Sequence, residues 1–583
     1  MKINGLILVL SVVFGINATA QNLPHQLTPQ EKERMQTYLE SFQHRNSQAG
    51  NFLVFDPPAS KVRAAAEWEE IDGLLVTWTS YLPTVREIIR WARLETTVWV
   101  VCSDSNAVKN SLTNNNIPLS NIRYLQINFD SVWSRDYGQW NVYTNDVDSL
   151  YMVDWIYNRP RPDDDVVPEF LSDATQIPMF SLTQSPNDLT HTGGNYMVDG
   201  YGTAFSSELI LDENPTKTQA QIDTIMKHFM GIQRYVKMPT LPYDGIHHID
   251  MHLKLLDEET LLWAEYPNGV ADGPQIEANL QYVQSNYPSV FGTPYKIVRI
   301  PSPPEIWNGN EYYPDNQGAY LTYTNAVFVN KTVLVTQYYT AYDTIARRIW
   351  ETALPGYKIQ FIDCNDIIQA SGALHCITKE VMSSDPLLIT HQALHDTYNT
   401  TNDYRVDAWI KHRSGIASAT LFYTTDTTQA YQSVAMSLTN AGTNTWTGFI
   451  PAQVPGTKVY YYVAAQSNSG KSQVRPMPAP QGYWKFEVLG PVSTFEPTAE
   501  LSVNLFPNPS NALVCLNLNR KHSIPVEASI YNAIGQQVGR FSAASLDTGN
   551  KKLFFDSSAL APGVYTVVVS TEQETKSLKL GVK

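Results

Sequence analysis

The sequence predicts an α/β fold for its larger part and β structure for the remainder, and three observations lead to this prediction. Between about residues 50 and 395, short apolar strands alternate with amphipathic helices. Beyond residue 395 the helical periodicity disappears, and alternating strands separated by turn residues continue to the C-terminus. The chain has 583 residues, of which 43% are hydrophobic and 17% charged, as expected of several soluble folded domains.

The α/β part repeats one kind of unit. Apolar runs predict strands and periodic runs predict helices, and their spacing fits a cyclic array of ββαβ-like units. The expected strands are 74–78, 97–102 and 122–127, and the expected helices are 84–94, 107–114, 218–229, 275–287 and 342–354. Further on, residues 402–490 contain alternating strands such as 417–423 and 458–464, which predict a β-sandwich of immunoglobulin type.

The first twenty residues have the pattern of a secretory signal peptide. Lys2 supplies a positive charge, an apolar run follows, and Ala18 and Ala20 form a small-residue cleavage site. The apolar run is too short to span a bilayer. We therefore predict an exported protein whose signal peptide is residues 1–20.

Residues 21–48 predict an N-terminal arm or, as we favour, a propeptide. One helix is expected there, because Thr28 can cap its N-terminus, Pro29 suits the first helical position and Glu31 completes a capping box.

The charge of the chain argues against a nucleic-acid partner. The formal net charge is −15, and no basic tract or stripe occurs. Phosphate backbones select clusters of Lys and Arg. We therefore expect no nucleic-acid partner.

Cysteine is rare, which limits what it can do here. The four cysteines are too few for a disulfide framework, so each is either a core residue or a reagent. Cys376 follows His375 and precedes Lys379 in a stretch that we predict to be a partly exposed turn. Neighbouring cations lower a thiol pKa and make the thiol nucleophilic. Cys376 is therefore a candidate nucleophile.

A histidine-rich stretch at residues 244–254 supplies candidate acid–base groups. If this stretch is extended, His248, Asp250 and His252 project from one face. Two hypotheses remain open. Together with His247 these residues could bind a metal; alternatively, His248 is a general acid and base and Asp250 holds a cationic group.

Residues 133–138 supply a second carboxylate. Asp136 either pairs with its neighbour Arg135 or binds a cation, in which case Trp133 forms one wall of the site. The pair Gly193–Gly194 makes a turn or lets the backbone approach a pocket. Two carboxylates grip a planar guanidinium and present its carbon to a thiolate. This combination favours a guanidine-modifying enzyme over a protease.

These motifs resemble a known family. The stretches 133–138, 193–200, 247–250, 323–325 and 372–376 occur in the order found in bacterial peptidylarginine deiminases and agmatine deiminases, and the similarity covers roughly residues 50–385. The resemblance implies a five-bladed α/β propeller of ββαβ units. It also implies that Cys376 attacks the guanidinium carbon, Asp136 and Asp250 bind its nitrogens, His248 transfers protons and Asn325 orders the site.

Two arginines favour a peptide substrate. Arg159 and Arg161 match the Arg-x-Arg pair with which the Porphyromonas-type enzyme grips the C-terminal carboxylate of its peptide. The alternative for this pair is a salt bridge with the acidic residues 163–165. Trp133 and Ile246 are further candidates for substrate contact. Agmatine has no carboxylate and would need no arginine there.

The C-terminal region also resembles a known module. Residues 506–510, 530–535 and 560–565 look like the type IX secretion sorting domain, which implies the outer-membrane secretion machinery as a partner. The predicted organisation is a signal peptide (1–20), an arm or propeptide (21–48), a catalytic propeller (49–395), an immunoglobulin-like domain (396–490), and a linker with the sorting domain (491–583).

The sequence therefore predicts a secreted or cell-surface deiminase that converts arginine in peptides or proteins to citrulline and ammonia, without a cofactor. The alternatives are a deiminase of agmatine or another small guanidine, a metal-dependent hydrolase using the histidine-rich stretch, and a non-catalytic adhesin. An intact set of Cys376, His248, Asp136 and Asp250 disfavours the adhesin.

Overall fold

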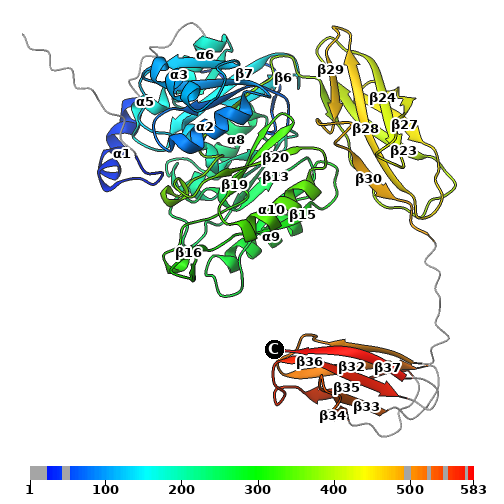
Figure 1. Cartoon of the computed structure of the whole chain (residues 1–583). Helices are drawn as coiled ribbons and strands as arrows, with labels where there is room; N and C mark the ends of the chain where they lie inside the picture. The colour runs from blue at the N-terminus through cyan, green and yellow to red at the C-terminus, as the bar shows by residue number, and fades with distance from the viewer. Residues whose placement is uncertain (1–22, 43–52, 491–500, 521–526, 542–548, 571–574) are drawn as a thin grey trace, which may run out of the picture. The chain divides into compact units, whose positions relative to one another are not determined.

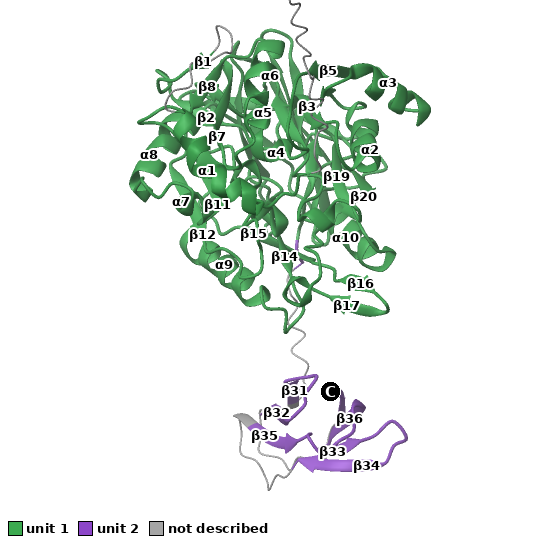
Figure 2. Ribbon diagram, turned by 90° about the vertical axis from the view of Figure 1, so that its left-hand side faces the viewer, with its two compact units in different colours: residues 1–488 green, residues 489–583 purple. Residues whose placement is uncertain are grey.

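The computed structural model describes residues 23–42, 53–490, 501–520, 527–541, 549–570 and 575–583. The chain divides into two compact units, residues 1–488 and 489–583 (Figure 2). The predicted signal peptide lies outside the described residues. Among the described helices, none has the length and apolar character needed to cross a membrane.

Five sheets in the larger unit repeat one pattern within the described residues (Figure 1). In each, an antiparallel strand pair is followed by helix and then by a strand that returns parallel to the second strand of the pair, as the ββαβ prediction requires. The modules are β21 (Lys379–Met382), β3 (Ile71–Thr77), α2 (Leu82–Ala92) and β4 (Thr97–Cys102), extended by α3 (Ser105–Asn114) and β5 (Ile122–Gln126); β6 (Trp140–Thr144), β7 (Leu150–Tyr157), α5 (Pro162–Asp165), α6 (Val167–Thr175) and β8 (Met179–Leu182); β10 (Met197–Val198), β11 (Thr203–Ser207), α7 (Leu209–Asp212), α8 (Gln219–Met230) and β12 (Arg234–Met238); β13 (Leu253–Leu255), β14 (Thr260–Glu265), α9 (Gly273–Asn286) and β15 (Lys296–Pro301); and β18 (Val327–Val329), β19 (Thr332–Gln337), α10 (Thr340–Ala353) and β20 (Lys358–Asp363).

Short elements complete this region. β1 (Leu53–Val54), β2 (Val62–Ala64) and β9 (Thr190–His191) join the sheet of the second module, and β16 (Glu305–Trp307) and β17 (Asn310–Tyr312) form a hairpin. The first module is completed by β21, which comes from the end of the region and pairs with β3. The predicted helices at 84–94, 107–114, 218–229, 275–287 and 342–354 are confirmed as α2, α3, α8, α9 and α10.

Local sequence explains these elements. α2 buries Val85, Ile88 and Ile89 on one face, so its amphipathic pattern matches a helix packed on a sheet. α8 begins with the capping box of Thr218 and Gln221, in which each side chain bonds the other's backbone N–H. The parallel strands are rich in β-branched residues and lie buried under the crossover helices.

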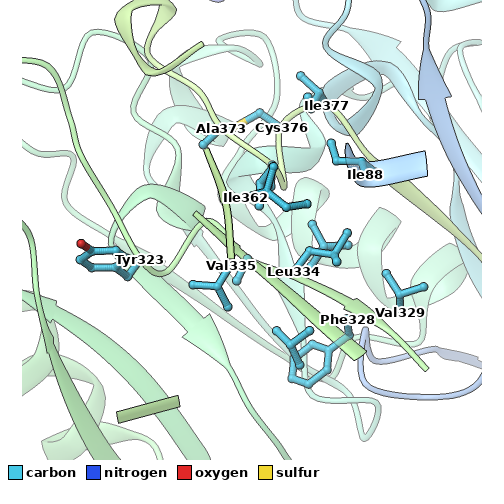
Figure 3. Packing of buried hydrophobic residues seen from close by; sticks show 14 of the residues in the cluster. Ile88, Tyr323, Phe328, Val329, Leu334, Val335, Ile362, Ala373, Cys376 and Ile377 are labelled. Carbon is cyan, nitrogen blue, oxygen red and sulfur yellow. The ribbon is translucent and has the colours of Figure 1, made fainter. Parts of the chain in front are cut away.

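The connections between modules converge on one place. They include α4 (Ser134–Tyr137), η1 (Gly193–Asn195), η2 (Ile249–Met251), the segment before β18, and the segment that leads from η4 (Ile368–Ala370) to β21. The condition that residues 248–252 are extended is not met, because residues 249–251 form a 3₁₀ turn. The largest hydrophobic cluster lies beneath this place and includes Cys376, Ile362 and Leu334 (Figure 3).

The N-terminal segment, residues 23–42, ends in α1 (Pro29–Phe42), which lies on the outside of the larger unit near α5 (Figures 1 and 2). The predicted capping box is present. Glu31 N–H donates to Thr28 Oγ1 at 3.2 Å, and Thr28 N–H donates to Glu31 Oε2 at 2.8 Å.

Residues 388–487 form two antiparallel sheets that enclose a core of their own, which includes Val406, Leu421 and Tyr461. Polar contacts join these sheets to the α/β region; for example, Arg475 pairs with Glu258. The sheets contain β22 (Leu388–Thr390), β23 (Tyr404–Lys411), β27 (Thr445–Ile450) and β26 (Ser437–Asn440), and β25 (Gln432–Ala435), β24 (Ile416–Thr424), β28 (Lys458–Ser467), β29 (Ser472–Arg475) and β30 (Trp484–Glu487). The β-strands predicted for this region are observed, and the immunoglobulin assignment stays a prediction.

The smaller unit is also built of β-strands around its own core, which includes Leu516, Ile530 and Val567. One sheet holds β31 (Leu501–Phe506), β32 (Leu513–Arg520) and β35 (Gly549–Asp556), and the other holds β34 (Gln537–Phe541), β33 (Glu527–Tyr531), β36 (Gly563–Ser570) and β37 (Thr575–Val582).

Candidate active site

Cys376 lies in the connection between η4 and β21, where its thiol meets two polar side chains. Asn325 Nδ2 donates to Sγ at 3.2 Å, and Sγ lies 3.6 Å from Asp250 Oδ2. The expectation of a partly exposed turn is wrong, because Cys376 is fully buried. Lys379 does not reach the thiol; its ammonium pairs with Glu380 and lies over the ring of Trp140.

The electrostatics around the thiol keep it protonated. Burial, followed by the charges of Asp250 and Asp136, raises the pKa of the Cys376 thiol well above its usual value. A thiolate is the nucleophilic form of cysteine. A nearby cation that offsets these carboxylates would lower the pKa of the thiol again.

Asp136 does not pair with its sequence neighbour Arg135. The Arg135 guanidinium turns away to Glu380, 2.8 Å distant, and to Glu67, 3.7 Å distant. Asp136 Oδ1 instead accepts the N–H of Gly194 at 3.1 Å. Burial alone would raise the pKa of Asp136, but the charges of His25 and His248 hold it below its usual range.

His248 faces the same space as the two carboxylates. Its Nδ1 lies 3.6 Å from Asp136 Oδ1, and neither ring nitrogen makes a hydrogen bond with another described residue. Burial lowers the pKa of His248 to about 4, although the charge of Asp136 opposes the shift. A neutral imidazole with two free nitrogens is suited to accept and return a proton.

Gly194 allows these groups to face one another. A Cβ at this position would overlap His248 Nδ1 and would lie 3.0 Å from Asp136 Oδ1 and 3.2 Å from Asp250 Oδ2. The close backbone approach predicted for the glycine pair is therefore observed.

Asp250 is held by a histidine that the sequence reasoning did not place in the site. His375 Nδ1 donates to Asp250 Oδ2 at 2.8 Å, and His375 Nε2 donates to Glu67 at 3.0 Å. Burial opposes ionisation, but the hydrogen bond and charge of His375 hold the pKa of Asp250 below its usual range. Glu67 in turn contacts Lys254. The position of His375 beside Cys376 was a usable signal, whereas nothing in the sequence marks Glu67.

Asn325 contacts both the thiol and the residue before it. Its Oδ1 accepts the backbone N–H of His375 at 2.9 Å, while its Nδ2 donates to Cys376 Sγ. Asn316, which lies nearby in the sequence, belongs to η3 (Pro314–Asn316) and bonds locally to Tyr313. Asn325 therefore fixes the thiol and the preceding residue together.

The predicted substrate-binding residues lie beside this cluster and are buried. Arg161 pairs with Glu31 at 2.7 Å, and no ion pair joins it to the described acidic residues 163–165. Arg159 Nε donates to the backbone oxygen of His25 at 3.1 Å. Trp133 stacks on His25, whereas Ile246 is packed in the core.

The histidine-rich stretch does not assemble the metal site considered above. Within the described residues, one group has three ligand atoms within 4.8 Å of one another, and it consists of His25, Asp136 and His248. His247 and His252 are not part of it. His25 Nε2 and Asp136 Oδ2 are in direct hydrogen-bonding contact, which is closer than two ligands of one metal ion approach each other.

The comparisons with known proteins agree with the motifs. Residues 63–381 match the family described as Porphyromonas-type peptidyl-arginine deiminase, which is more than half of the chain. The chain therefore belongs to this family, whose members act on guanidino C–N bonds. Residues 504–583 match the secretion system C-terminal sorting domain. The protein thus carries a type IX sorting domain, which indicates export to the cell surface or beyond and contact with the secretion machinery.

Individual relatives are more distant. The chain is 24% identical over 277 residues to a Legionella pneumophila protein named as an agmatine deiminase, covering 45% of this chain and 75% of the relative. A Vibrio parahaemolyticus protein of the same name is 25% identical over 299 residues, covering 45% and 78%. A crystal structure titled as an agmatine deiminase aligns with a TM-score of 0.51 and 19% identity over 58% of this chain and 100% of its own, which shows a shared fold.

The packing at Gly194 leads to a first prediction. Gly194→Ala should reduce deiminase activity by about 100-fold or more, because the methyl group displaces His248 from Asp136 and Asp250. The measurement is kcat/KM for ammonia release, together with the thermal midpoint. Gly273→Ala is the matched control, since a Cβ there meets its nearest neighbour at 3.7 Å. Equal activity of the two variants would contradict the assigned geometry.

The electrostatics of the thiol lead to a second prediction. Because the pKa of Cys376 is raised, its alkylation by neutral 2-chloroacetamide should accelerate with pH and show no plateau below about pH 9. At pH 7 the cationic 2-chloroacetamidine should react at least about tenfold faster, after each rate is divided by that of a small thiol, because its charge offsets the carboxylates. Peptide mapping of Cys376 gives both rates. A plateau near pH 7 with no preference for the cation would contradict this account.

Proposed function

We propose that this protein is an exported, cysteine-dependent deiminase that hydrolyses the guanidinium group of arginine in peptides or proteins, preferably at a peptide C-terminus, to citrulline and ammonia. The observation that carries the proposal is the meeting of Asp136, His248, Asp250 and Cys376 in one buried cluster. Two ionised carboxylates beside a thiol suit a planar cation with an electrophilic carbon.

The first half of the proposed reaction forms a bond to sulfur. The guanidinium binds to Asp136 and Asp250, and its charge lowers the pKa of the neighbouring thiol. Neutral His248 takes the thiol proton, and Sγ of Cys376 bonds to the guanidinium carbon. The resulting imidazolium then protonates one terminal nitrogen, so that the C–N bond breaks and ammonia leaves. A thiouronium remains on the cysteine.

The second half uses one water molecule. His248, neutral again, removes a proton from the water while its oxygen bonds to the same carbon. The C–S bond then breaks, the sulfur recovers a proton, and the ureido group of citrulline is released. One water enters, and one ammonia leaves together with the proton of the guanidinium, which is ammonium in total; no cofactor is required. Asn325 keeps the thiol in place through both steps.

Arg159 and Arg161 support a substrate with a carboxylate. Both are buried beside the carboxylate cluster, and Arg161 already binds a carboxylate in this structure, that of Glu31. A charge-assisted bond to a free C-terminus would be worth about 1.5–3 kcal/mol. Trp133 would cover the flat face of the guanidinium, as it covers the His25 ring, and Ile246 would line the site.

A small-guanidine deiminase is the second candidate, and the names of the Legionella and Vibrio relatives favour it. Agmatine would use the same thiol, imidazole and carboxylates. It would leave the buried cations Arg159 and Arg161 without a counter-charge from the substrate, which is a costly arrangement.

The proposed domain organisation follows the sequence boundaries. The signal peptide is residues 1–20, the arm 21–48, the catalytic domain 49–395, the immunoglobulin-like domain 396–490 and the sorting region 491–583. We further propose that the five ββαβ modules surround the site as blades of a propeller. The pairing of β21 with β3 supports closure, as do the site residues supplied by successive connections.

The test compares three substrates on a chain of residues 46–490: agmatine, a peptide that ends in arginine, and the same peptide with an amidated C-terminus. We expect citrulline and ammonia from the free-carboxylate peptide, none after Cys376→Ala, and a rise in KM of about 10–100-fold after Arg159→Ala. Arg123→Ala, at an exposed position on β5, is the matched control.

Other outcomes separate the alternatives. Turnover of agmatine alone would keep the chemistry and remove the proposed role of Arg159 and Arg161. Loss of activity with a chelator, and none with a thiol reagent, would favour a metal-dependent hydrolase. Release from none of the three substrates would overturn the assignment.

A further inference from the structure

The N-terminal segment does not lie free on the surface; it enters the candidate active site. Residues 23–27 cross the cluster of carboxylates, and α1 continues outward past α5. Leu23 accepts a hydrogen bond from Trp133 Nε1 at 3.0 Å, and Pro24 accepts one from Arg161 Nη2 at 2.7 Å. Both donors are residues that we assign to substrate binding.

His25 occupies the position proposed for the substrate cation. Its ring is fully buried, stacks on Trp133 with centroids 4.1 Å apart, and contacts Asp136 Oδ2 through Nε2. Its Nδ1 donates to the backbone oxygen of Ser371 at 2.8 Å. A carbonyl oxygen can only accept, and Asp136 is ionised, so both ring nitrogens donate. His25 is therefore an imidazolium, a flat cation that resembles a guanidinium.

Glu31 occupies the position proposed for the substrate carboxylate. It is 2% exposed, and its Oε1 accepts from Arg161 Nε at 2.7 Å. Burial opposes ionisation, but the hydrogen bond from Arg161 holds the pKa of Glu31 below its usual value. The same carboxylate closes the capping box with Thr28, which fixes its direction. Arg159 meanwhile binds the backbone oxygen of His25.

The segment thus presents a flat cation to Asp136 and a carboxylate to Arg161, the two features proposed for an arginine peptide. It is tethered to the catalytic region by the chain itself, so its effective concentration is of millimolar order. At that concentration, an intrinsic Kd of about 10 μM would close the site in roughly 99% of molecules. Weak affinity is therefore sufficient.

We propose that residues 23–42 are an intramolecular, substrate-like inhibitor, which must leave the site before an arginine peptide binds. This inference rests on the proposed function and adds its regulation. Export would then deliver a closed enzyme, and displacement of the segment would open it. The direct contact of His25 with Asp136 blocks the proposed cation position, and the pairing of Glu31 with Arg161 holds α1 in place.

The test uses conservative variants of the full-length chain. His25→Phe keeps a ring on Trp133 and removes the charge on Asp136. Glu31→Gln keeps the capping box and side-chain volume and removes the charge on Arg161. Glu33→Gln is the matched control, because Glu33 is exposed on the same helix. We expect His25→Phe and Glu31→Gln each to raise kcat/KM for a peptide ending in arginine by about tenfold, and Glu33→Gln to leave it unchanged.

A second readout does not depend on catalysis. The rate at which 2-chloroacetamide alkylates Cys376, measured by peptide mapping at one pH, should rise about tenfold in the same two variants.

In addition, a protease recognition sequence inserted after Phe42 allows the segment to be cut from the folded protein. Cutting and dilution should raise activity, and a synthetic peptide of residues 23–42 should restore inhibition competitively.

The outcomes are distinguishable. If alkylation accelerates but no form releases citrulline, closure by the segment is supported and the deiminase assignment fails. Unchanged alkylation and activity in both variants and after cutting would overturn the inference. Opening of the wild-type chain by a chelator, with no effect on His25→Phe, would also overturn it in favour of a metal ion held by His25, Asp136 and His248.

Discussion

Carboxylates buried away from water must be balanced by cations, and this requirement organises the centre of the molecule. Asp136, Asp250 and Glu67 are all buried, and each has a cationic neighbour. These neighbours come from parts of the chain that are distant in the sequence: His25 from the N-terminal segment, His375 from the connection before β21, and Lys254 from β13. The repeated ββαβ units therefore act as a rigid support that holds opposite charges together with little access for solvent.

The same requirement relates substrate binding, thiol activation and regulation. Cys376 adjoins Asp250, so its thiol stays protonated until a cation arrives to offset the carboxylates. A guanidinium would supply that charge at the moment of binding, and activation would accompany recognition. His25 supplies a similar charge from within the chain, which keeps Asp136 ionised and balanced. Its ring also fills the space, so the thiol gains no electrophile.

Much of the fold was predictable because it depends on local patterns. The helices α2, α3, α8, α9 and α10 follow from amphipathic periodicity, and the capping box of Thr28 and Glu31 follows from residue spacing. The motifs also located the groups that meet in the site. The burial of Cys376 was mispredicted and the turn at residues 249–251 was not foreseen, because both depend on packing between connections. Glu67 and His25 were missed for the same reason. Glu67 lies 308 residues from His375, which it contacts, and His25 lies 111 residues from Asp136, which it contacts.

The central claim is that Cys376 forms a covalent bond with the guanidinium carbon between the carboxylates. The most direct measurement is mass spectrometry of the protein quenched with acid during turnover of an arginine peptide, followed by peptide mapping. The account predicts that the peptide containing Cys376 carries the mass of the substrate less one ammonia, and that Cys102, Cys364 and Cys515 stay unmodified. Turnover without an adduct on Cys376, together with citrulline formation by Cys376→Ala, would contradict it.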